Sequence, residues 1–141
     1  MAAKHKYQHS TLGATTTLPP DQVAVIAKSS AEKVKNKVPG QPFVRFEGAQ
    51  PGRLNFSVRN LGGHGELMAF HAIVEGGDGN TAVRTGIDMF KTEQQRVFFI
   101  PVGPKSLLGY GQYKRFAATL LADLQAADSS SRGQLVEQPH G

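Results

Sequence analysis

The chain has 141 residues, a formal net charge of +5 and no cysteine. A chain of this length forms one domain with a hydrophobic core of its own. The absence of cysteine excludes a disulfide framework, a thiolate zinc site and a cysteine nucleophile. No run of roughly 18 apolar residues occurs, and MAAKHKYQHS at the start lacks the apolar segment of a secretory signal. We therefore expect a cytoplasmic protein with no membrane-spanning helix.

The positive charge is concentrated in one segment, KSSAEKVKNK at residues 28–37. Its lysines fall on several sides of a helix, whereas nucleic-acid-binding proteins gather basic side chains on one face, often with aromatic residues between them. No aromatic residue occurs between Tyr7 and Phe43. We interpret these lysines as a solvated helix end and predict no specific nucleic-acid partner.

A strand and a helix are predicted first in the chain. KYQHSTLGATTT, residues 6–17, is rich in threonine and favours an extended strand. The following prolines cannot continue a strand, and Pro20 with Asp21 suits the first turn of a helix. Apolar and small residues then recur at spacings of three and four until Pro39 and Gly40, which predicts a helix ending there.

Five segments in the middle of the chain predict strands joined by short turns. They are PFVRFEG, RLNFSVRN, ELMAFHAIVE, TAVRTGIDMF and RVFFIPV. Apolar and polar residues alternate cleanly in RLNFSVRN, as in a strand that is buried on one face. The connections QPG at 50–52, GGHG at 62–65 and GGDGN at 76–80 contain the glycine and asparagine that tight turns need. These features indicate antiparallel hairpins.

The last predicted element is an amphipathic helix from about Ser106 to Ala126, with Ser106 as its N-cap. Its apolar series is Tyr113, Phe116, Ala117, Leu120, Leu121 and Leu124. We expect this broad face to pack against the sheet. The composition of SSSRGQLVEQPHG predicts a disordered tail over residues 128–141, after a single domain at 5–127 and a disordered N-terminus at 1–4.

The order of these elements, together with TLPPDQV, resembles the START-like (SRPBCC) helix-grip superfamily, also called the polyketide cyclase or Bet v 1-like group. In that superfamily a strand leads through a proline-acid-x-valine sequence into the first helix, and a curved sheet wraps around a C-terminal helix. Here Pro20, Asp21 and Val23 match the sequence, and the resemblance covers residues 5–127. It implies an α+β helix-grip fold of about six antiparallel strands in the order β-α-β-β-β-β-β-α.

A gap between a curved sheet and a helix is a common kind of apolar ligand site. The candidate lining residues are Phe56, Val58, Phe70, His71, Met89, Phe99, Tyr110 and Tyr113. Our leading hypothesis is non-catalytic binding of a small hydrophobic or amphipathic molecule, such as a lipid or a polyketide-like compound, between the sheet and the C-terminal helix. If the same residues form a solid core, the chain is instead a structural or protein-interaction module, as a monomer or homodimer. A cyclase-like or hydrolase-like enzyme on this fold is the third hypothesis.

The sequence predicts no catalytic residue, metal site or cofactor. In GPKSLLGYGQ, residues 103–112, no glycine directly precedes the lysine, so the stretch is not a P-loop; weak anion binding at a helix N-terminus stays as a hypothesis. The five histidines show no HExxH spacing. GGDGN lacks the regular carboxylate spacing of a calcium loop.

Overall fold

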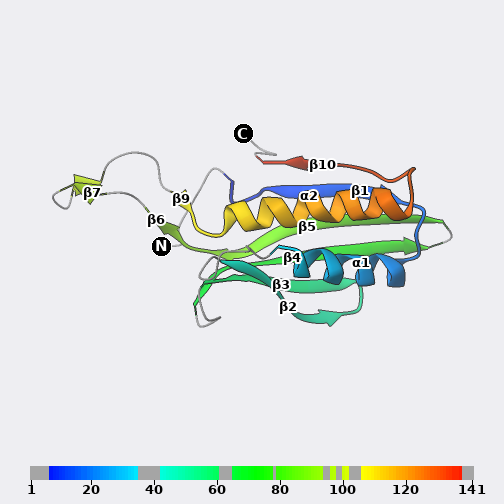
Figure 1. Cartoon of the computed structure of the whole chain (residues 1–141), viewed down its shortest axis with the longest axis horizontal. Coiled ribbons are helices and arrows are strands. Elements are labelled where there is room, and N and C mark those ends of the chain that lie inside the picture. Colours follow the sequence, from blue (N-terminus) through cyan, green and yellow to red (C-terminus); the bar gives the residue numbers. More distant parts are fainter. Residues whose placement is uncertain are drawn as a thin grey trace.

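The computed structural model describes residues 7–34, 42–60, 65–77, 79–93, 96–97, 100–101 and 106–137. Its main strands are β1 (Thr11–Thr16), β2 (Phe43–Gln50), β3 (Arg53–Arg59), β4 (Glu66–Gly77), β5 (Asn80–Phe90) and β10 (Arg132–Val136). Its helices are α1 (Pro20–Glu32) and α2 (Tyr110–Ala127). The six strands form one open antiparallel sheet in the order β10-β1-β5-β4-β3-β2 (Figure 1).

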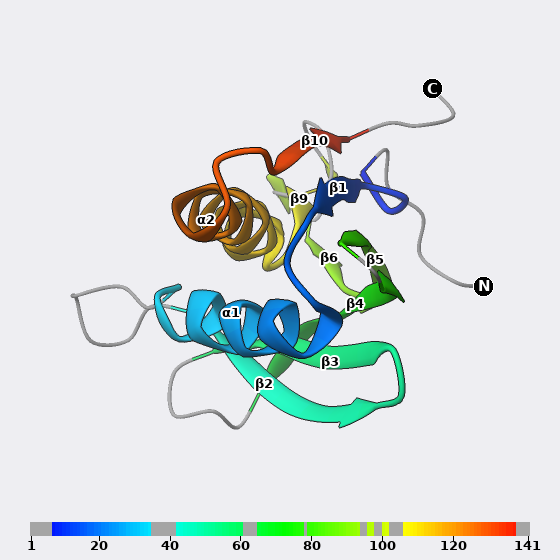
Figure 2. The ribbon, with the colours of Figure 1, turned by 90° about the vertical axis from the view of Figure 1, so that its right-hand side faces the viewer.

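Both helices lie inside the curve of this sheet, so the molecule has a helical layer on the inner face and a bare outer face (Figure 2). Each helix packs against the other, and α1 also packs against β2 and β4. The predicted α+β fold, an antiparallel sheet against a long helix near the C-terminus, is confirmed.

Helix α1 begins where the sequence predicts, with Pro20 in its first turn and Asp21 beside the positive end of the helix dipole. It ends at Glu32, earlier than the predicted stop at Pro39 and Gly40, which lie outside the described residues. The chain leaves the helix because Val34 is buried and its carbonyl oxygen accepts a hydrogen bond from the Val44 amide at 3.2 Å. The end of α1 is thereby tied to β2.

Strands β2 to β5 form the predicted hairpins. Phe56 of β3 lies opposite Phe46 of β2 and Phe70 of β4, so aromatic side chains stand in one row across the inner face. Gly52 turns the β2–β3 hairpin with a φ of 72°, a conformation that favours glycine. The four strands therefore follow from alternation and turn residues that the sequence makes visible.

Three irregularities interrupt the register of this hairpin series. They lie in β2 between Phe46 and Gly48, in β4 between Glu66 and Met68, and in β5 between Ile87 and Met89. Two of them leave an acidic residue without a cross-strand partner, Glu47 in β2 and Asp88 in β5. A bulge redirects the side chains around it, and both acids lie on the outer face, where they bond to arginine side chains.

Helix α2 begins at Tyr110, so the predicted start at Ser106 is wrong. Gly109 has a left-handed φ of 82°, which stops a helix from extending further toward the N-terminus. A Cβ at Gly109 would lie 3.1 Å from Val58, so the glycine also allows the chain to pass close to β3. Ser106 belongs instead to the short strand β9 (Ser106–Leu107), which pairs with β6 (Thr92–Glu93).

The sixth strand of the sheet is not the predicted RVFFIPV. Its described residues form the short pair β7 (Arg96–Val97) and β8 (Ile100–Pro101). The sixth strand is β10, within the segment that we predicted to be a disordered tail. It pairs with β1 from Thr11 opposite Val136 to Thr15 opposite Arg132.

Asp128 accounts for the return of the chain after α2. Its carboxylate accepts hydrogen bonds from the Thr17 amide at 2.8 Å, the Thr17 hydroxyl at 2.8 Å and the Thr16 hydroxyl at 3.0 Å. Hydrogen bonds from Ser130 and from Thr17 lower the pKa of Asp128 below its ordinary value. The turn is thus fastened to the end of β1, and β10 follows along the edge of β1.

We predict that Leu120→Ala will lower the free energy of unfolding by about 3 kcal/mol, because Leu120 is fully buried in the core under α2. The measurement is urea denaturation followed by circular dichroism. Val25→Ala is the matched control, since Val25 is 65% exposed on α1 and should change stability by less than about 0.5 kcal/mol. Equal losses for the two variants would contradict the packing of α2 described above.

Candidate functional site

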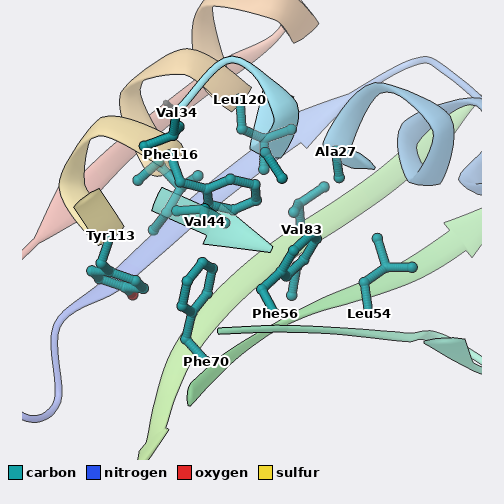
Figure 3. Close-up of a cluster of buried hydrophobic side chains, with 14 of the residues drawn as sticks. Ala27, Val34, Val44, Leu54, Phe56, Phe70, Val83, Tyr113, Phe116 and Leu120 are labelled. Atoms are coloured by element: carbon teal, nitrogen blue, oxygen red, sulfur yellow. The ribbon is translucent and has the colours of Figure 1, made fainter. Parts of the chain in front are cut away.

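Four of the predicted lining residues, Phe56, Val58, Phe70 and Tyr113, come together in the core on the inner face of the sheet. Figure 3 shows Phe56, Phe70 and Tyr113 among these buried side chains. Each is at most 1% exposed. The ring centroids of Phe56 and Phe70 are 5.3 Å apart, and those of Phe70 and Tyr113 are 5.1 Å apart. Phe116 of α2 contacts Phe56 at 4.8 Å and Phe70 at 5.2 Å. These rings pack directly on one another between α2 and strands β3 and β4.

The hydroxyl of Tyr113 links α2 to the sheet. It donates to the carbonyl oxygen of Ser10 at 2.7 Å and lies 2.7 Å from the hydroxyl of Thr85. The same Thr85 oxygen accepts a hydrogen bond from the Leu12 amide at 2.9 Å. Burial raises the pKa of Tyr113 to about 12, despite the opposing effect of its hydrogen bonds with Thr85 and Ser10. Tyr113 therefore stays protonated and acts as a hydrogen-bond donor within the core.

Tyr110, another predicted lining residue, connects the start of α2 to the end of the described chain. Its hydroxyl donates to Glu137 at 2.8 Å and lies 3.0 Å from the Ser10 hydroxyl, and its ring stacks on Tyr7 at 4.8 Å. Burial raises the pKa of Tyr110 above its ordinary value. Within the described residues, every buried side-chain nitrogen and oxygen has a hydrogen-bond partner. The tyrosine hydroxyls thus satisfy polar groups of the protein itself.

His71 and Met89 lie on the outer face, away from Phe56 and Phe70. His71 stands between the inward residues Phe70 and Ala72 of β4, and its Nδ1 is 2.8 Å from Asp88 Oδ1. Asp88 also accepts a hydrogen bond from Arg53 at 3.1 Å. Met89 faces outward because the bulge at Asp88 shifts the alternation of β5. The remaining predicted residue, Phe99, lies outside the described residues.

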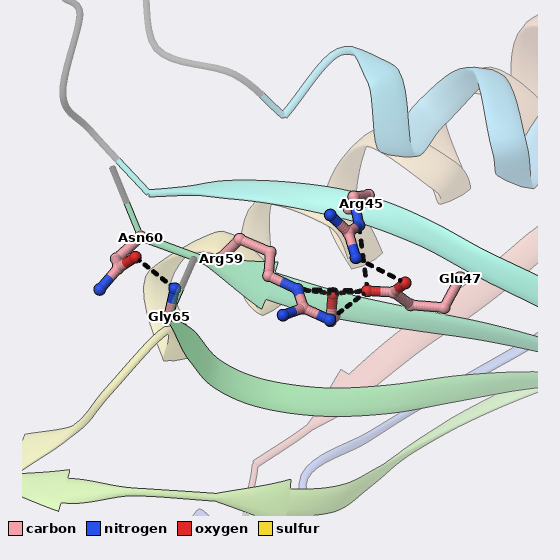
Figure 4. Close-up of polar contacts among 6 residues, drawn as sticks. Arg45, Glu47, Arg59, Asn60 and Gly65 are labelled. Atoms are coloured by element: carbon pink, nitrogen blue, oxygen red, sulfur yellow. Dashed lines mark hydrogen bonds and ion pairs between the residues drawn. The ribbon is translucent and has the colours of Figure 1, made fainter. Parts of the chain in front are cut away.

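Glu47 is the centre of a second outer-face cluster (Figure 4). Its carboxylate accepts hydrogen bonds from Arg45 at 3.0 Å, from Arg59 at 2.8 Å and from the Ser57 hydroxyl. Partial burial raises the pKa of Glu47, but the bonds from Arg45, Ser57 and Arg59 outweigh it and lower the pKa to about 2. The cluster fixes β2 to β3 by charge as well as by the strand ladder.

A surface hollow that the sequence did not predict lies between the end of α1 and strand β2. We call it the α1–β2 hollow; its volume is about 390 Å³, and its described lining residues are Ala31, Glu32, Phe43, Val44, Arg45 and Phe46. The Nζ atom of Lys28 lies 4.9 Å from the centre of the Phe46 ring. The ring of Phe46 in turn contacts the buried Phe56 at 5.6 Å. The only sequence signal for the α1–β2 hollow was the pair of phenylalanines in PFVRFEG. That pair gives no information about the helix that packs beside it.

The described part of the chain contains neither a candidate metal site nor a candidate membrane-spanning helix. No group of three or more histidine, aspartate or glutamate side chains there could hold a metal ion. Neither described helix is long and apolar enough to cross a bilayer.

Comparison with protein-family models, curated proteins and solved structures gave no match for this chain. The class of the protein is therefore defined by its own fold, an α+β domain in which a six-stranded antiparallel sheet curves around two helices.

We predict that Glu47→Gln will flatten the acid limb of the stability curve. The pKa of Glu47 is depressed in the folded protein, so its contribution is present above about pH 4.5 and is lost as the pH falls toward 2. Because the carboxylate lies at the surface, solvent screening reduces this contribution to about 1 kcal/mol. Urea denaturation at a series of pH values measures it. Glu75→Gln, at an exposed position of β4, is the control, and a wild-type acid limb in Glu47→Gln would contradict the prediction.

Proposed function

We propose that this protein is a non-catalytic binding protein that holds a small amphipathic molecule in the α1–β2 hollow. The observation that carries the proposal is the hollow itself, whose volume of about 390 Å³ is within the usual range of ligand pockets. The proposal also includes membership of the START-like helix-grip superfamily. A long helix inside a curved antiparallel sheet supports that membership.

The apolar residues of the hollow and the neighbouring Lys28 favour a ligand with an apolar body and an anionic end that lies away from Glu32, which also belongs to the lining. Phe43 and Phe46, which are both partly exposed, provide apolar surface for the body. Lys28 stands over the Phe46 ring and has no carboxylate partner among the described residues, so its ammonium group is available to an anion. Arg45 already pairs with Glu47 and serves as a wall of the hollow.

The position of Phe46 supports a route from the hollow toward the interior. Its ring separates the hollow from Phe56, which belongs to the aromatic cluster under α2. A rotation of Phe46 would extend the apolar contact of a longer ligand to Phe56. The original expectation of a ligand between sheet and α2 is thus retained in a modified form, with the hollow as the site of first contact.

The second candidate is a protein-interaction module with a solid core. The direct ring contacts among Phe56, Phe70, Tyr113 and Phe116 favour it, as do the satisfied tyrosine hydroxyls. In this case the inner face only stabilises the fold, and recognition uses the outer surface.

The test is native mass spectrometry of gently purified protein, together with titration by dodecanoate, an anion with an apolar chain. We expect a retained ligand or saturable dodecanoate binding in wild-type protein. Lys28→Gln should weaken dodecanoate binding about fivefold, the loss of one charge-assisted contact at an exposed site. Lys114→Gln is the matched control, since Lys114 also lies over an aromatic ring, 5.8 Å from the centre of Tyr110.

Absence of both retained ligand and dodecanoate binding would contradict the proposal and leave the interaction module as the better account. Equal weakening in Lys28→Gln and Lys114→Gln would contradict the location of the site.

A further inference from the structure

The outer face of the sheet carries five arginines, and only some of them form ion pairs with described residues. They are Arg45, Arg53, Arg59, Arg84 and Arg132, placed on this face by the alternation of their strands and the cross-strand register. Arg45 and Arg59 pair with Glu47, and Arg53 pairs with Asp88. Arg84 and Arg132 form no ion pair with any described residue, and both are exposed. Two guanidinium groups on this face are thus available to an external anion.

The register brings these two arginines to opposite sides of β1. Arg84 of β5 lies opposite Gly13, and Arg132 of β10 lies opposite Thr15. Two strand spacings and a two-residue offset place their Cα atoms about 12 Å apart. Arginine side chains are long enough for both guanidinium groups to approach one small ion above β1.

Between them the surface of β1 is shallow and open, because Gly13 has no side chain on the outer face. This β1–β10 hollow has a volume of about 360 Å³ and is lined by Gly13, Ala14, Thr15, Arg132, Gly133 and Gln134. A Cβ added at Gly13 would meet nothing within 4 Å, so the backbone there is open to a ligand. On the inner side Gly133 is covered, since a Cβ there would lie 3.0 Å from Leu121 of α2. The hollow therefore opens on the outer face alone.

The chemistry of the described lining is that of a hydrogen-bond donor site. Arg132 offers a guanidinium group, Gln134 an amide and Thr15 a hydroxyl, and no carboxylate contributes to the described lining. Across the sheet from Thr15, the nearest acidic residue is Glu75 of β4, which lies opposite Ala82 of β5. Two strands, β1 and β5, separate Glu75 from β10. No ion pair joins Glu75 to Arg84.

We propose that the β1–β10 hollow binds a phosphate group, held between the guanidinium groups of Arg84 and Arg132 over Gly13. Guanidinium groups match the geometry of phosphate oxygens and form charge-assisted hydrogen bonds with them. Bound phosphate links β10 to β5 across β1, so it also protects the edge strand β10 from local opening. This site is separate from the α1–β2 hollow and does not depend on the proposed function.

The experiment is a titration of the full chain with sodium phosphate, followed by the backbone amide NMR signals of Gly13 and Gly133. We expect saturable shifts with a Kd of about 1 to 10 mM, the range of a few charge-assisted bonds at an exposed site. Arg84→Gln and Arg132→Gln should each raise the Kd at least about fivefold. Arg59→Gln is the matched control on the same sheet face, since Arg59 pairs with Glu47 and lines neither hollow, and it should leave the Kd unchanged.

Two further arms distinguish the sources of the phosphate group. Glycerol 3-phosphate represents a soluble phosphate ester, and phosphatidylcholine vesicles that contain phosphatidic acid represent a lipid headgroup. Saturable binding of any of the three that is weakened at least about fivefold in both Arg84→Gln and Arg132→Gln supports the proposal. The proposal is overturned if sodium chloride at matched ionic strength produces the same shifts, if no arm saturates, or if Arg59→Gln weakens binding as much as the other two variants.

Discussion

The fold depends on the contact between one aromatic residue of α2 and two of the sheet. Phe116 packs against Phe56 of β3 and Phe70 of β4 with ring centroids 4.8 and 5.2 Å away. Aromatic pairs at such distances add to the burial of apolar area in stabilising a core. Because the three rings come from segments far apart in the chain, this contact fixes the position of α2 inside the curve of the sheet.

Because side chains fill the inner face, we propose that ligands are recognised at the edges of the sheet. The rings occupy the space beneath α2, and the hydroxyls of Tyr110 and Tyr113 are used by Ser10, Thr85 and Glu137. The two hollows described above lie instead at opposite edges, one beside β2 and one beside β10. On the bare face between them, the bulges at Glu47 and Asp88 place carboxylates that engage three of the five arginines. The charge pattern of the outer face is thus a consequence of the bulges.

Elements with a strong local signal could be predicted from the sequence, and elements that depend on distant partners could not. Pro20 marks the start of α1, and the alternation in RLNFSVRN gives β3, because both signals lie within a few residues. The strand β10 is polar and short, and it forms because Asp128 fastens the turn before it to Thr16 and Thr17, more than a hundred positions earlier. Gly109 likewise sets the start of α2 through a backbone conformation that no periodicity reports.

The candidate site shows the same division. Phe56, Val58, Phe70 and Tyr113 share the predicted face, as strand alternation and the helical ridge require. The alternation of β4 would also have separated His71 from Phe70, since neighbours in a strand point to opposite faces. Met89 is different, because period-two alternation from Ile87 places it inside and only the bulge at Asp88 turns it outward. The two hollows depend on the packing of α1 on β2 and the pairing of β10 with β1. These are tertiary contacts between distant segments, which local sequence patterns do not reveal.

The most direct measurement of the central contact is the set of nuclear Overhauser effects from the ring protons of Phe116 in the full chain. The packing described above predicts strong effects to the rings of both Phe56 and Phe70 and weaker or no effects to residues of the outer face such as Met89. The account would be contradicted if the ring protons of Phe116 showed no effect to either Phe56 or Phe70. Rapid motional averaging of the Phe116 ring signals in a hydrated core would contradict it as well.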